Sequence, residues 1–208
     1  MRKPQSVRAL EELGRVRLSK RFFMRDFLYS EIANYNGLQN SPDDSDLAIA
    51  AGKRLCESLL EPLADRFGHI AIRSSYRSKV VNRFGNENKL NCSRNEANYA
   101  GHIWDERDAD GHMGATACII VTSFIDYYEA TGRWQALAWW VHDSLPYHNM
   151  QFFPRYAAFN LTFREAAEPS IYSYIPQTTG WLTKPDMANA TGDHASEYAD
   201  WLATLETP

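Results

Sequence analysis

One helical pattern in the first third of the chain limits the folds that this sequence can adopt. Apolar residues recur at every third or fourth position from Ala48 to Phe67, which is the spacing of an amphipathic helix. Ser41, Asp43, Asp44 and Ser45 offer N-caps before this pattern, and Gly68 ends it. We expect one long helix here, with a kink near Pro62, because the proline ring removes an amide donor and crowds the preceding turn.

Short segments of strand type follow this helix. The first alternates directly after Gly68, and a later one, at 157–163, alternates apolar with small or polar residues. A helical region at 123–142, broken near Gly132, lies between them. We expect strands at residues 70–72, 117–121, 150–153, 157–163 and 171–175. Helices and strands in this arrangement indicate the α+β class.

The composition excludes several classes of protein. The 208 residues suffice for one sizeable domain, and 22 Lys and Arg stand against 26 Asp and Glu, a net charge of −4. This balance argues against a nucleic-acid partner. No apolar run reaches the ~20 residues of a membrane span, and none of signal-peptide length follows the basic start. We expect cytoplasmic synthesis without a signal peptide, no membrane span, and reduced thiols at Cys56, Cys92 and Cys118.

The chain divides into a central domain and two flanking segments. Residues 1–17 are basic and weakly amphipathic, which predicts an N-terminal arm or helix. Residues 18–175 contain the expected helices and strands. Residues 176–208 are rich in Gly, Pro and small polar residues, which predicts a C-terminal extension that wraps on the surface, with Trp181 and Trp201 as its anchors.

Three motifs in the first half occur in a characteristic order. They are Leu-Ser-Lys-Arg-Phe at 18–22, Leu-Glu-Pro-Leu at 60–63 and Ser-Ser-Tyr-Arg-Ser at 74–78. Together they resemble the N-terminal half of the M15 peptidases, the family of zinc D,D-carboxypeptidases and murein endopeptidases. The resemblance implies a Hedgehog/DD-peptidase-like domain, in which helices pack on one side of a small antiparallel sheet. It also implies zinc on the exposed sheet face and peptidoglycan, or its peptide stems, as the partner.

The resemblance assigns a role to the loop after the first strand. In that family, the arginine of the Ser-x-Tyr-Arg-Ser loop holds the substrate carboxylate or the developing oxyanion. Arg77 matches this position, so the resemblance implies substrate binding by Arg77 together with Ser75 and Tyr76. The chemistry is sound, because a planar guanidinium meets a carboxylate or a tetrahedral anion with two hydrogen bonds.

The zinc ligands of the family are degenerate in this sequence. The family pattern for the first two ligands is Ser-x-His-x-x-Gly-x-Ala-x-Asp, and the third is a His on the last strand. The nearest alignment places His102 at the first ligand, Cys118 at the Asp, and Asn160 at the third. An amide oxygen is a weak zinc ligand, so this set is poor. Asn160 is instead a candidate substrate-binding residue.

A relocated metal site is the alternative. Residues 82–115 are rich in Asn and Gly, and within them two imidazoles and two carboxylates lie close together: His102, Asp105, Asp108 and His112. A solvated acidic turn is the competing interpretation of this segment. A second pair, His142 and Asp143, ends the tryptophan-rich helical region. The candidate metal ligands are thus His102, Cys118 and His112, and the candidate general bases for a zinc-bound water are Asp105 and His142.

Two further chemistries deserve comparison with structural roles. A Cys118 thiol beside His102 would form a nucleophile and base, but its apolar strand favours inert packing. Eight aromatic residues could line a glycan groove, although their helical and strand spacing favours the core: Trp134, Trp139, Trp140, Tyr147, Phe152, Phe153, Tyr156 and Phe159.

Two functional hypotheses follow. The first is an M15-type peptidoglycan peptidase-like protein that acts on or binds cell-wall peptide stems, in a phage-associated setting and with zinc as cofactor. The alternative is a non-catalytic binding or structural module of a virion or particle, which keeps the fold, has lost the zinc site and contacts other particle proteins. The virion setting rests only on where such domains commonly occur.

Overall fold

A six-stranded mixed sheet forms the centre of the protein. The computed structural model describes residues 3–205, so the ends of the expected arm and of the expected extension lie outside the described residues. The strands occur in the order β1-β2-β4-β3-β5-β6, with bounds β1 (Ile70–Ser74), β2 (Gly114–Val121), β3 (Asn149–Phe152), β4 (Phe159–Arg164), β5 (Ser170–Ser173) and β6 (Gly180–Thr183). The α+β class is confirmed. The expectation of an antiparallel sheet is wrong, because β3 and β5 run parallel.

The parallel pair follows from the central position of β4. This strand pairs with β2 on one edge and with β3 on the other, so the chain that leaves it finds neither edge free. It leaves at the end of the sheet where β3 begins, because Asn149 lies opposite Thr162. β5 starts at that same end, pairs with the free edge of β3 and runs in the same direction.

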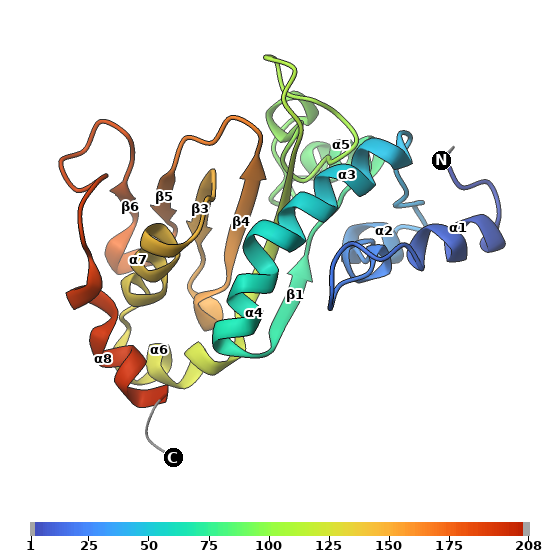
Figure 1. Ribbon diagram of the computed structural model, residues 1–208. Coiled ribbons are helices and arrows are strands. Elements are labelled where there is room, and N and C mark those ends of the chain that lie inside the picture. The colour runs from blue at the N-terminus through green and yellow to red at the C-terminus, as the bar shows by residue number, and fades with distance from the viewer. Residues whose placement is uncertain (1–2, 206–208) are drawn as a thin grey trace.

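Three helices cover one face of this sheet: α3 (Ser45–Leu55), α4 (Glu61–Phe67) and α7 (Gln135–Ser144) (Figure 1). α3 lies over β2 and β4. The covered face is apolar, since Phe159, Leu161 and Phe163 of β4 are buried in the core. The alternate residue Asn160 points to the opposite face, as the two-residue period of a strand requires. The sheet therefore presents a polar row on the side away from α3 and α4.

The expected long helix is present as two α-helices joined by a π-helical turn. The turn spans Cys56–Leu60, directly before the helix that contains Pro62. There the amide of Glu61 donates to the carbonyl of the fifth residue before it. The predicted irregularity near Pro62 thus takes the form of a wider turn, and Leu59 and Leu63 remain buried on either side of it.

The remaining helices lie around the sheet. They are α1 (Val7–Gly14), α2 (Glu31–Tyr35), α5 (Lys79–Glu87), α6 (Ile125–Thr131) and α8 (Ala195–Leu205), with 3₁₀ turns at Met24–Phe27, Asn95–Asn98, Thr122–Phe124, Arg155–Ala157 and Pro176–Thr178. α5 extends into the Asn- and Gly-rich stretch 82–115. Ser78 caps the start of this helix by accepting a hydrogen bond from the amide of Val81. The break expected near Gly132 is confirmed, with φ of 70° at that residue.

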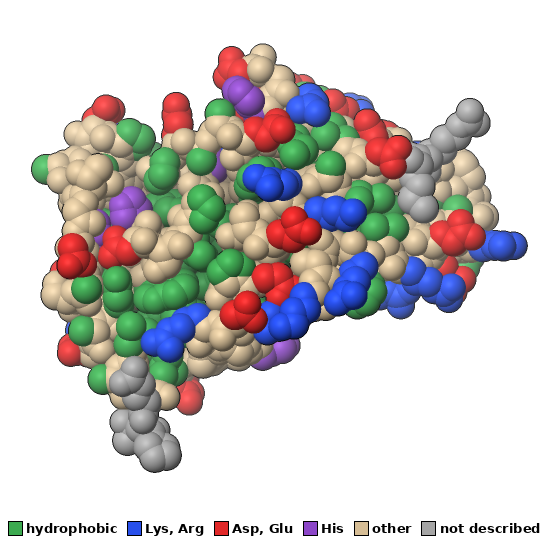
Figure 2. Space-filling model, in the orientation of Figure 1, with side chains coloured by type: hydrophobic (Ala, Val, Ile, Leu, Met, Phe, Trp, Pro, Cys, Tyr) green, Lys and Arg blue, Asp and Glu red, His purple; other side chains and the backbone are tan. Residues whose placement is uncertain are grey.

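The face covered by α3 and α4 has mixed charge. Figure 2 shows basic and acidic side chains side by side along it. Arg21, for example, forms ion pairs with both Glu61 and Asp65.

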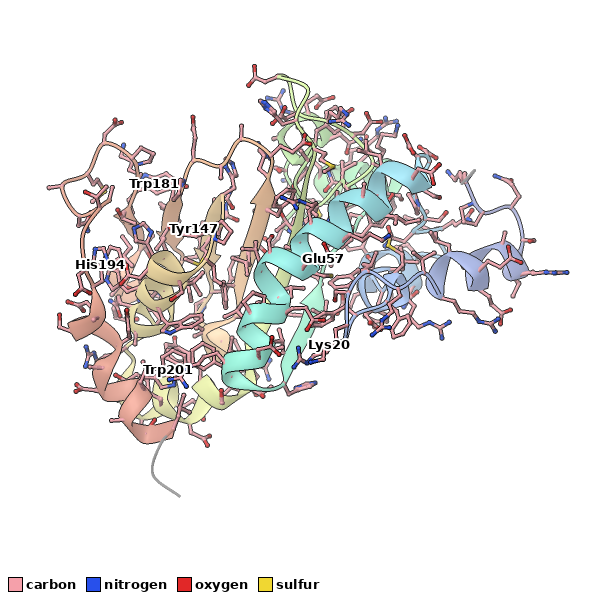
Figure 3. The ribbon with its side chains drawn as sticks, in the orientation of Figure 1. Lys20, Glu57, Tyr147, Trp181, His194 and Trp201 are labelled. Carbon is pink, nitrogen blue, oxygen red and sulfur yellow. The ribbon has the colours of Figure 1, made fainter. Side chains whose placement is uncertain are left out.

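The described part of the C-terminal segment, residues 176–205, lies mostly at the surface. Trp201 anchors it in the core, as expected, whereas Trp181, the other expected anchor, is 53% exposed. β6 extends the sheet beside β5, and α8 packs against α7. Trp201 of α8 is fully buried, and its ring lies 4.5 Å from that of Phe67 and 4.7 Å from that of Phe124 (Figure 3). An indole of this size fixes α8 against the end of the sheet.

Most of the eight aromatic residues weighed above belong to the core. Five of them are at most 5% exposed, which confirms the core interpretation for that group: Trp134, Trp139, Tyr147, Phe152 and Phe159. Trp140 is partly buried and packs edge-on against Phe67. Tyr156 is exposed, and Phe153 is half-buried on the opposite side of the sheet from Phe152.

We predict that Gly114→Ala destabilises the protein. A Cβ at Gly114 would lie 2.2 Å from the carbonyl oxygen of Ala100 and 2.8 Å from that of Phe163, both backbone atoms that cannot move independently. The free energy of unfolding should fall by about 2–3 kcal/mol in urea titrations. Gly14→Ala is the matched control, because the three atoms nearest to its Cβ all belong to the Arg25 side chain and lie 3.3 Å or more away. Equal stability of Gly114→Ala and the unmodified protein would contradict the close approach.

Candidate functional site

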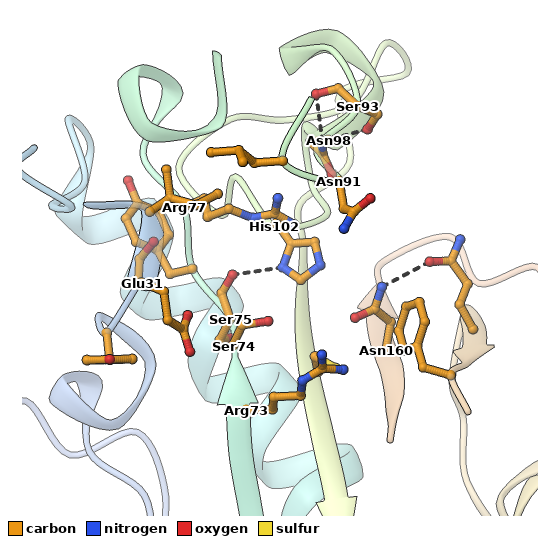
Figure 4. A pocket seen from close by; sticks show the side chains of 18 of the residues that line it. Glu31, Arg73, Ser74, Ser75, Arg77, Asn91, Ser93, Asn98, His102 and Asn160 are labelled. Carbon is orange, nitrogen blue, oxygen red and sulfur yellow. Dashed lines mark hydrogen bonds between the residues drawn. The ribbon is translucent and has the colours of Figure 1, made fainter. Parts of the chain in front are cut away.

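A cavity of about 870 Å³ opens on the face of the sheet opposite α3 and α4. Its floor is formed by β2, β4 and β3, and its walls by the end of β1, the loop that follows β1, and residues 90–102 (Figure 4). The ionisable residues that line it include Arg73, Arg77, His102, Cys118 and Glu31. The cavity therefore contains both charged groups and neutral ionisable groups.

Arg73 reaches the cavity because β1 is bulged. Ile72 pairs with Ile119 and Ser74 pairs with Cys118, so Arg73 is an extra residue between two adjacent pairs. A bulge of this kind redirects a side chain next to a binding site. Arg73 and Cys118 both line the cavity, and the positive charge of Arg73 opposes the rise in the pKa of the Cys118 thiol (Figure 4 shows Arg73). The sequence gives no sign of this residue, because a bulge depends on which strand lies opposite.

The loop after β1 positions Arg77 through its two preceding residues. The Ser75 hydroxyl donates to the carbonyl of Thr116 at 2.9 Å, and the fully buried Tyr76 donates its hydroxyl to Asp105 at 3.1 Å. Arg77 then donates its amide to the carbonyl of His102 at 2.8 Å. The three residues predicted to form the substrate loop thus all line the cavity, with Ser75 and Tyr76 holding the backbone.

The guanidinium of Arg77 is only partly engaged. Its Nη1 lies 2.6 Å from the sulfur of Cys92, whereas its Nε is buried and has no hydrogen-bond partner among the described residues. A buried guanidinium N–H without an acceptor is costly, so this group is suited to an acceptor that a ligand would bring.

His102 is a buried, neutral imidazole. Its Nδ1 lies 2.7 Å from the carbonyl oxygen of Ser75, which can only accept, so Nδ1 carries the proton and Nε2 the lone pair. Burial, followed by the charge of Arg77, lowers the pKa of His102 to about 3. Asn160 approaches the same ring from β4 (Figure 4).

Cys118 and Asn160 are direct neighbours across β2 and β4. Burial raises the pKa of the Cys118 thiol, although Arg73 and Arg77 oppose this shift. The Asn160 amide donates to the side-chain oxygen of Gln151 at 2.9 Å. The structure therefore brings together His102, Cys118 and Asn160, the three residues that the family alignment placed at the zinc ligands, in one cavity.

The residues at this position do not fit zinc. Of the three residues, only His102 offers a nitrogen lone pair that could bind zinc. The Cys118 thiol is held in its protonated form, and Asn160 offers only an amide oxygen. Two guanidinium groups, those of Arg73 and Arg77, lie in the same cavity and would repel a divalent cation. We therefore derive no chemical step through a metal at this position.

Asp105 lies outside the cavity lining, in the layer behind the Arg77 loop. Its carboxylate accepts hydrogen bonds from the Tyr76 hydroxyl and, at 2.7 Å, from the amide of Asp43. Burial raises the pKa of Asp105. Its side chain is 4% exposed and supports Tyr76, which makes it a positioning residue for the loop rather than the general base expected from the sequence.

His112 also lies apart from the cavity. It groups with Asp108 and Asp110 near the tip of the loop before β2. Asp108 accepts hydrogen bonds from the amides of His112 and Asp110 and pairs with Arg164 at 3.4 Å. The segment is thus an acidic turn balanced by an arginine, and His112 does not join His102 and Cys118.

His142 lies at the end of α7, where it groups with Asp143 and His194. The ring nitrogens of His142 contact the Tyr147 hydroxyl at 2.6 Å and the Ala190 carbonyl at 3.2 Å. Asp143 pairs with the imidazole of His194 at 2.7 Å. These groups satisfy one another and fasten the segment before α8 to α7. His142 is therefore not placed to act as a general base in the cavity. The sequence did not indicate His194 as a member of this group, because it lies about fifty residues further along the chain.

Comparison with known proteins gives no relative. No family model, no curated protein and no solved structure matches this chain. The assignment of a function rests on the residues of the cavity and on the resemblance of the sequence motifs.

We predict that His102 stays neutral in the folded protein well below the pKa of about 6.5 of a free histidine. Between pH 6.5 and pH 3, the imidazole of His102 is protonated in the unfolded chain but not in the folded protein. The free energy of unfolding therefore falls as the pH falls towards the folded pKa of about 3. The slope from this one group is about 1.4 kcal/mol per pH unit. His102→Gln should make the free energy of unfolding fall less steeply between about pH 6 and pH 4.

Urea titrations across this pH range measure the effect. His69→Gln, at an exposed position, is the matched control and should keep the original slope. Parallel pH profiles for His102→Gln and the unmodified protein would contradict a buried neutral imidazole.

Proposed function

We propose that this protein is an M15 peptidase-like module that binds carboxylate-bearing peptides of the cell-wall stem type without zinc chemistry at the inherited position. The observation that carries the proposal is the pair of arginines, Arg73 and Arg77, that enter one cavity from a bulge and from the adjoining loop. Guanidinium groups are the preferred partners of carboxylates in proteins, since they match both oxygens.

The charge balance of the cavity supports a peptide ligand. Among the described residues, its lining contains two arginines and a single carboxylate, that of Glu31 from α2. The neutral groups His102 and Cys118 add no charge near pH 7, because burial holds both in their uncharged forms. A ligand carboxylate could pair with the arginines and a ligand amino group with Glu31. A short peptide carries both a carboxylate and an amino group.

The resemblance of the motifs at 18–22, 60–63 and 74–78 supplies the proposed ligand class, the peptide stems of peptidoglycan. A setting in a virion or particle, with other particle proteins as partners, belongs to the same proposal.

None of the helices in the described residues 3–205 combines the length and the hydropathy of a membrane span.

A zinc peptidase is the second candidate function, and one observation favours it. Nδ1 of His102 donates to the Ser75 carbonyl, which fixes the orientation of the ring and leaves the lone pair of Nε2 free. Metal-binding histidines are commonly oriented in this way. The thiol and amide neighbours described above argue against it.

We predict that a stem peptide ending in a free carboxylate binds in the cavity and that its C-terminal amide binds at least tenfold more weakly. Arg73→Gln and Arg77→Gln should each lower the affinity for the carboxylate peptide by about 10- to 100-fold, which corresponds to the loss of one hydrogen bond to a charged group. Isothermal titration calorimetry measures these affinities. Arg66→Gln, on the opposite face in α4, is the control and should bind normally. Equal affinity for the acid and the amide would overturn the proposal.

We also predict that the purified protein contains no stoichiometric zinc and that it releases no muropeptides from sacculi in a chelator-sensitive way. Elemental analysis and chromatography of the released products measure the two quantities. About one zinc per chain, with cleavage abolished by a chelator and restored by zinc, would instead establish the peptidase.

A further inference from the structure

A strip of exposed and half-buried aromatic side chains continues the floor of the cavity towards the edge of the sheet. Across the strands, Asn160 lies opposite Gln151, Gln151 opposite Tyr172, and Tyr172 opposite Trp181. These residues form one row, since cross-strand partners point to the same face. Phe153 and Tyr174 lie beside the row, two residues after Gln151 and Tyr172 and directly after the ends of β3 and β5. We call Phe153, Tyr172, Tyr174 and Trp181 the aromatic strip.

The rings of the strip hold one another in place while leaving surface open. Tyr174 is 48% exposed and Trp181 is 53% exposed. The rings of Phe153 and Tyr174 are parallel, with centroids 5.6 Å apart. Tyr172 meets Tyr174 at 4.9 Å and Trp181 at 5.1 Å, in both cases edge-on. Such contacts fix the ring planes before any ligand arrives, which lowers the entropic cost of binding.

The strip is continuous with the cavity, because Gln151, Phe153, Asn160 and Tyr174 line the cavity wall themselves. Its chemistry differs from that of the arginine end. None of its four side chains carries a charge, and the two amides of Asn160 and Gln151 lie between the strip and Arg73. A ligand that crosses both regions therefore has an anionic part at the arginines and a neutral part on the rings.

We propose that the aromatic strip binds the sugar rings of a saccharide joined to the peptide in the cavity, so that the complete ligand is a glycopeptide. Pyranose rings present flat C–H faces to aromatic planes and hydroxyl or acetamido groups to neighbouring amides. Rings set edge-on to one another offer separate faces for successive sugars rather than one flat platform. A nucleic-acid strand would require basic groups along its path, and the strip has none.

This inference rests on the proposed peptide site, and its test uses a probe that the peptide site does not recognise. The probe is tetra-N-acetylchitotetraose, a neutral oligosaccharide without a carboxylate. Titration calorimetry should show saturable binding, and Trp181→Ala and Tyr174→Ala should each weaken it about tenfold, as loss of one aromatic stacking surface does. Trp181→Phe keeps a ring and should bind within about threefold of the unmodified protein.

Tyr35→Ala is the matched control, because Tyr35 is 91% exposed in α2, outside the strip. Thermal melting verifies that every variant is folded. Absence of saturable binding to the folded protein, or unchanged binding in both alanine variants, would overturn the inference. A dimer in sedimentation experiments that Trp181→Ala dissociates would also overturn it, because the strip would then be an interface between two copies.

The arginine variants separate this inference from the proposed function. Arg73→Gln and Arg77→Gln should leave oligosaccharide binding unchanged, since the probe has no carboxylate. Oligosaccharide binding without any stem-peptide binding would overturn the peptide site and support the strip. Stem-peptide binding without oligosaccharide binding would overturn the strip alone.

Discussion

A set of hydrogen bonds between two loops and the edge of β2 holds the site together. Thr116 donates its amide to the carbonyl of Gly101 at 3.0 Å, and Arg77 donates its amide to the carbonyl of His102. The imidazole of His102 returns a hydrogen bond to Ser75. Because these bonds engage backbone groups and a buried ring, the sheet rather than flexible side chains fixes the distance between Arg77 and His102. The shape of the cavity and its electrostatics depend on this junction between the loop after β1, residues 101–102 and β2.

The junction also decides the charge of the cavity. Buried ionisable groups favour their neutral forms, so His102 stays unprotonated and Cys118 stays a thiol, while guanidinium groups remain charged. The cationic character of the cavity thus belongs to Arg73 and Arg77. An anion preference that comes from arginine does not change across the physiological pH range, unlike one that depends on histidine.

The sequence by itself determined the local elements. Helical periodicity gave the helix before Gly68, Pro62 marked the irregular turn within it, and Gly132 marked the break between α6 and α7. Alternation located most strands, and the motif order brought attention to Arg77 and His102. These features were accessible because each depends on residues within about one or two turns of the chain. The α+β class followed from the same signals.

The tertiary structure alone decided which distant residues meet. The parallel pairing of β5, the bulge at Arg73 and the strip that ends at Trp181 depend on which strand lies opposite. The separation of Asp105, His112 and His142 from the cavity has the same origin. Sequence spacing had grouped Asp105 and His112 with His102 and had paired His142 with Asp143, but Asp105, His112 and His142 each have their own neighbours elsewhere in the fold. Cross-strand register and burial join residues far apart in the chain, and no local pattern encodes either of them.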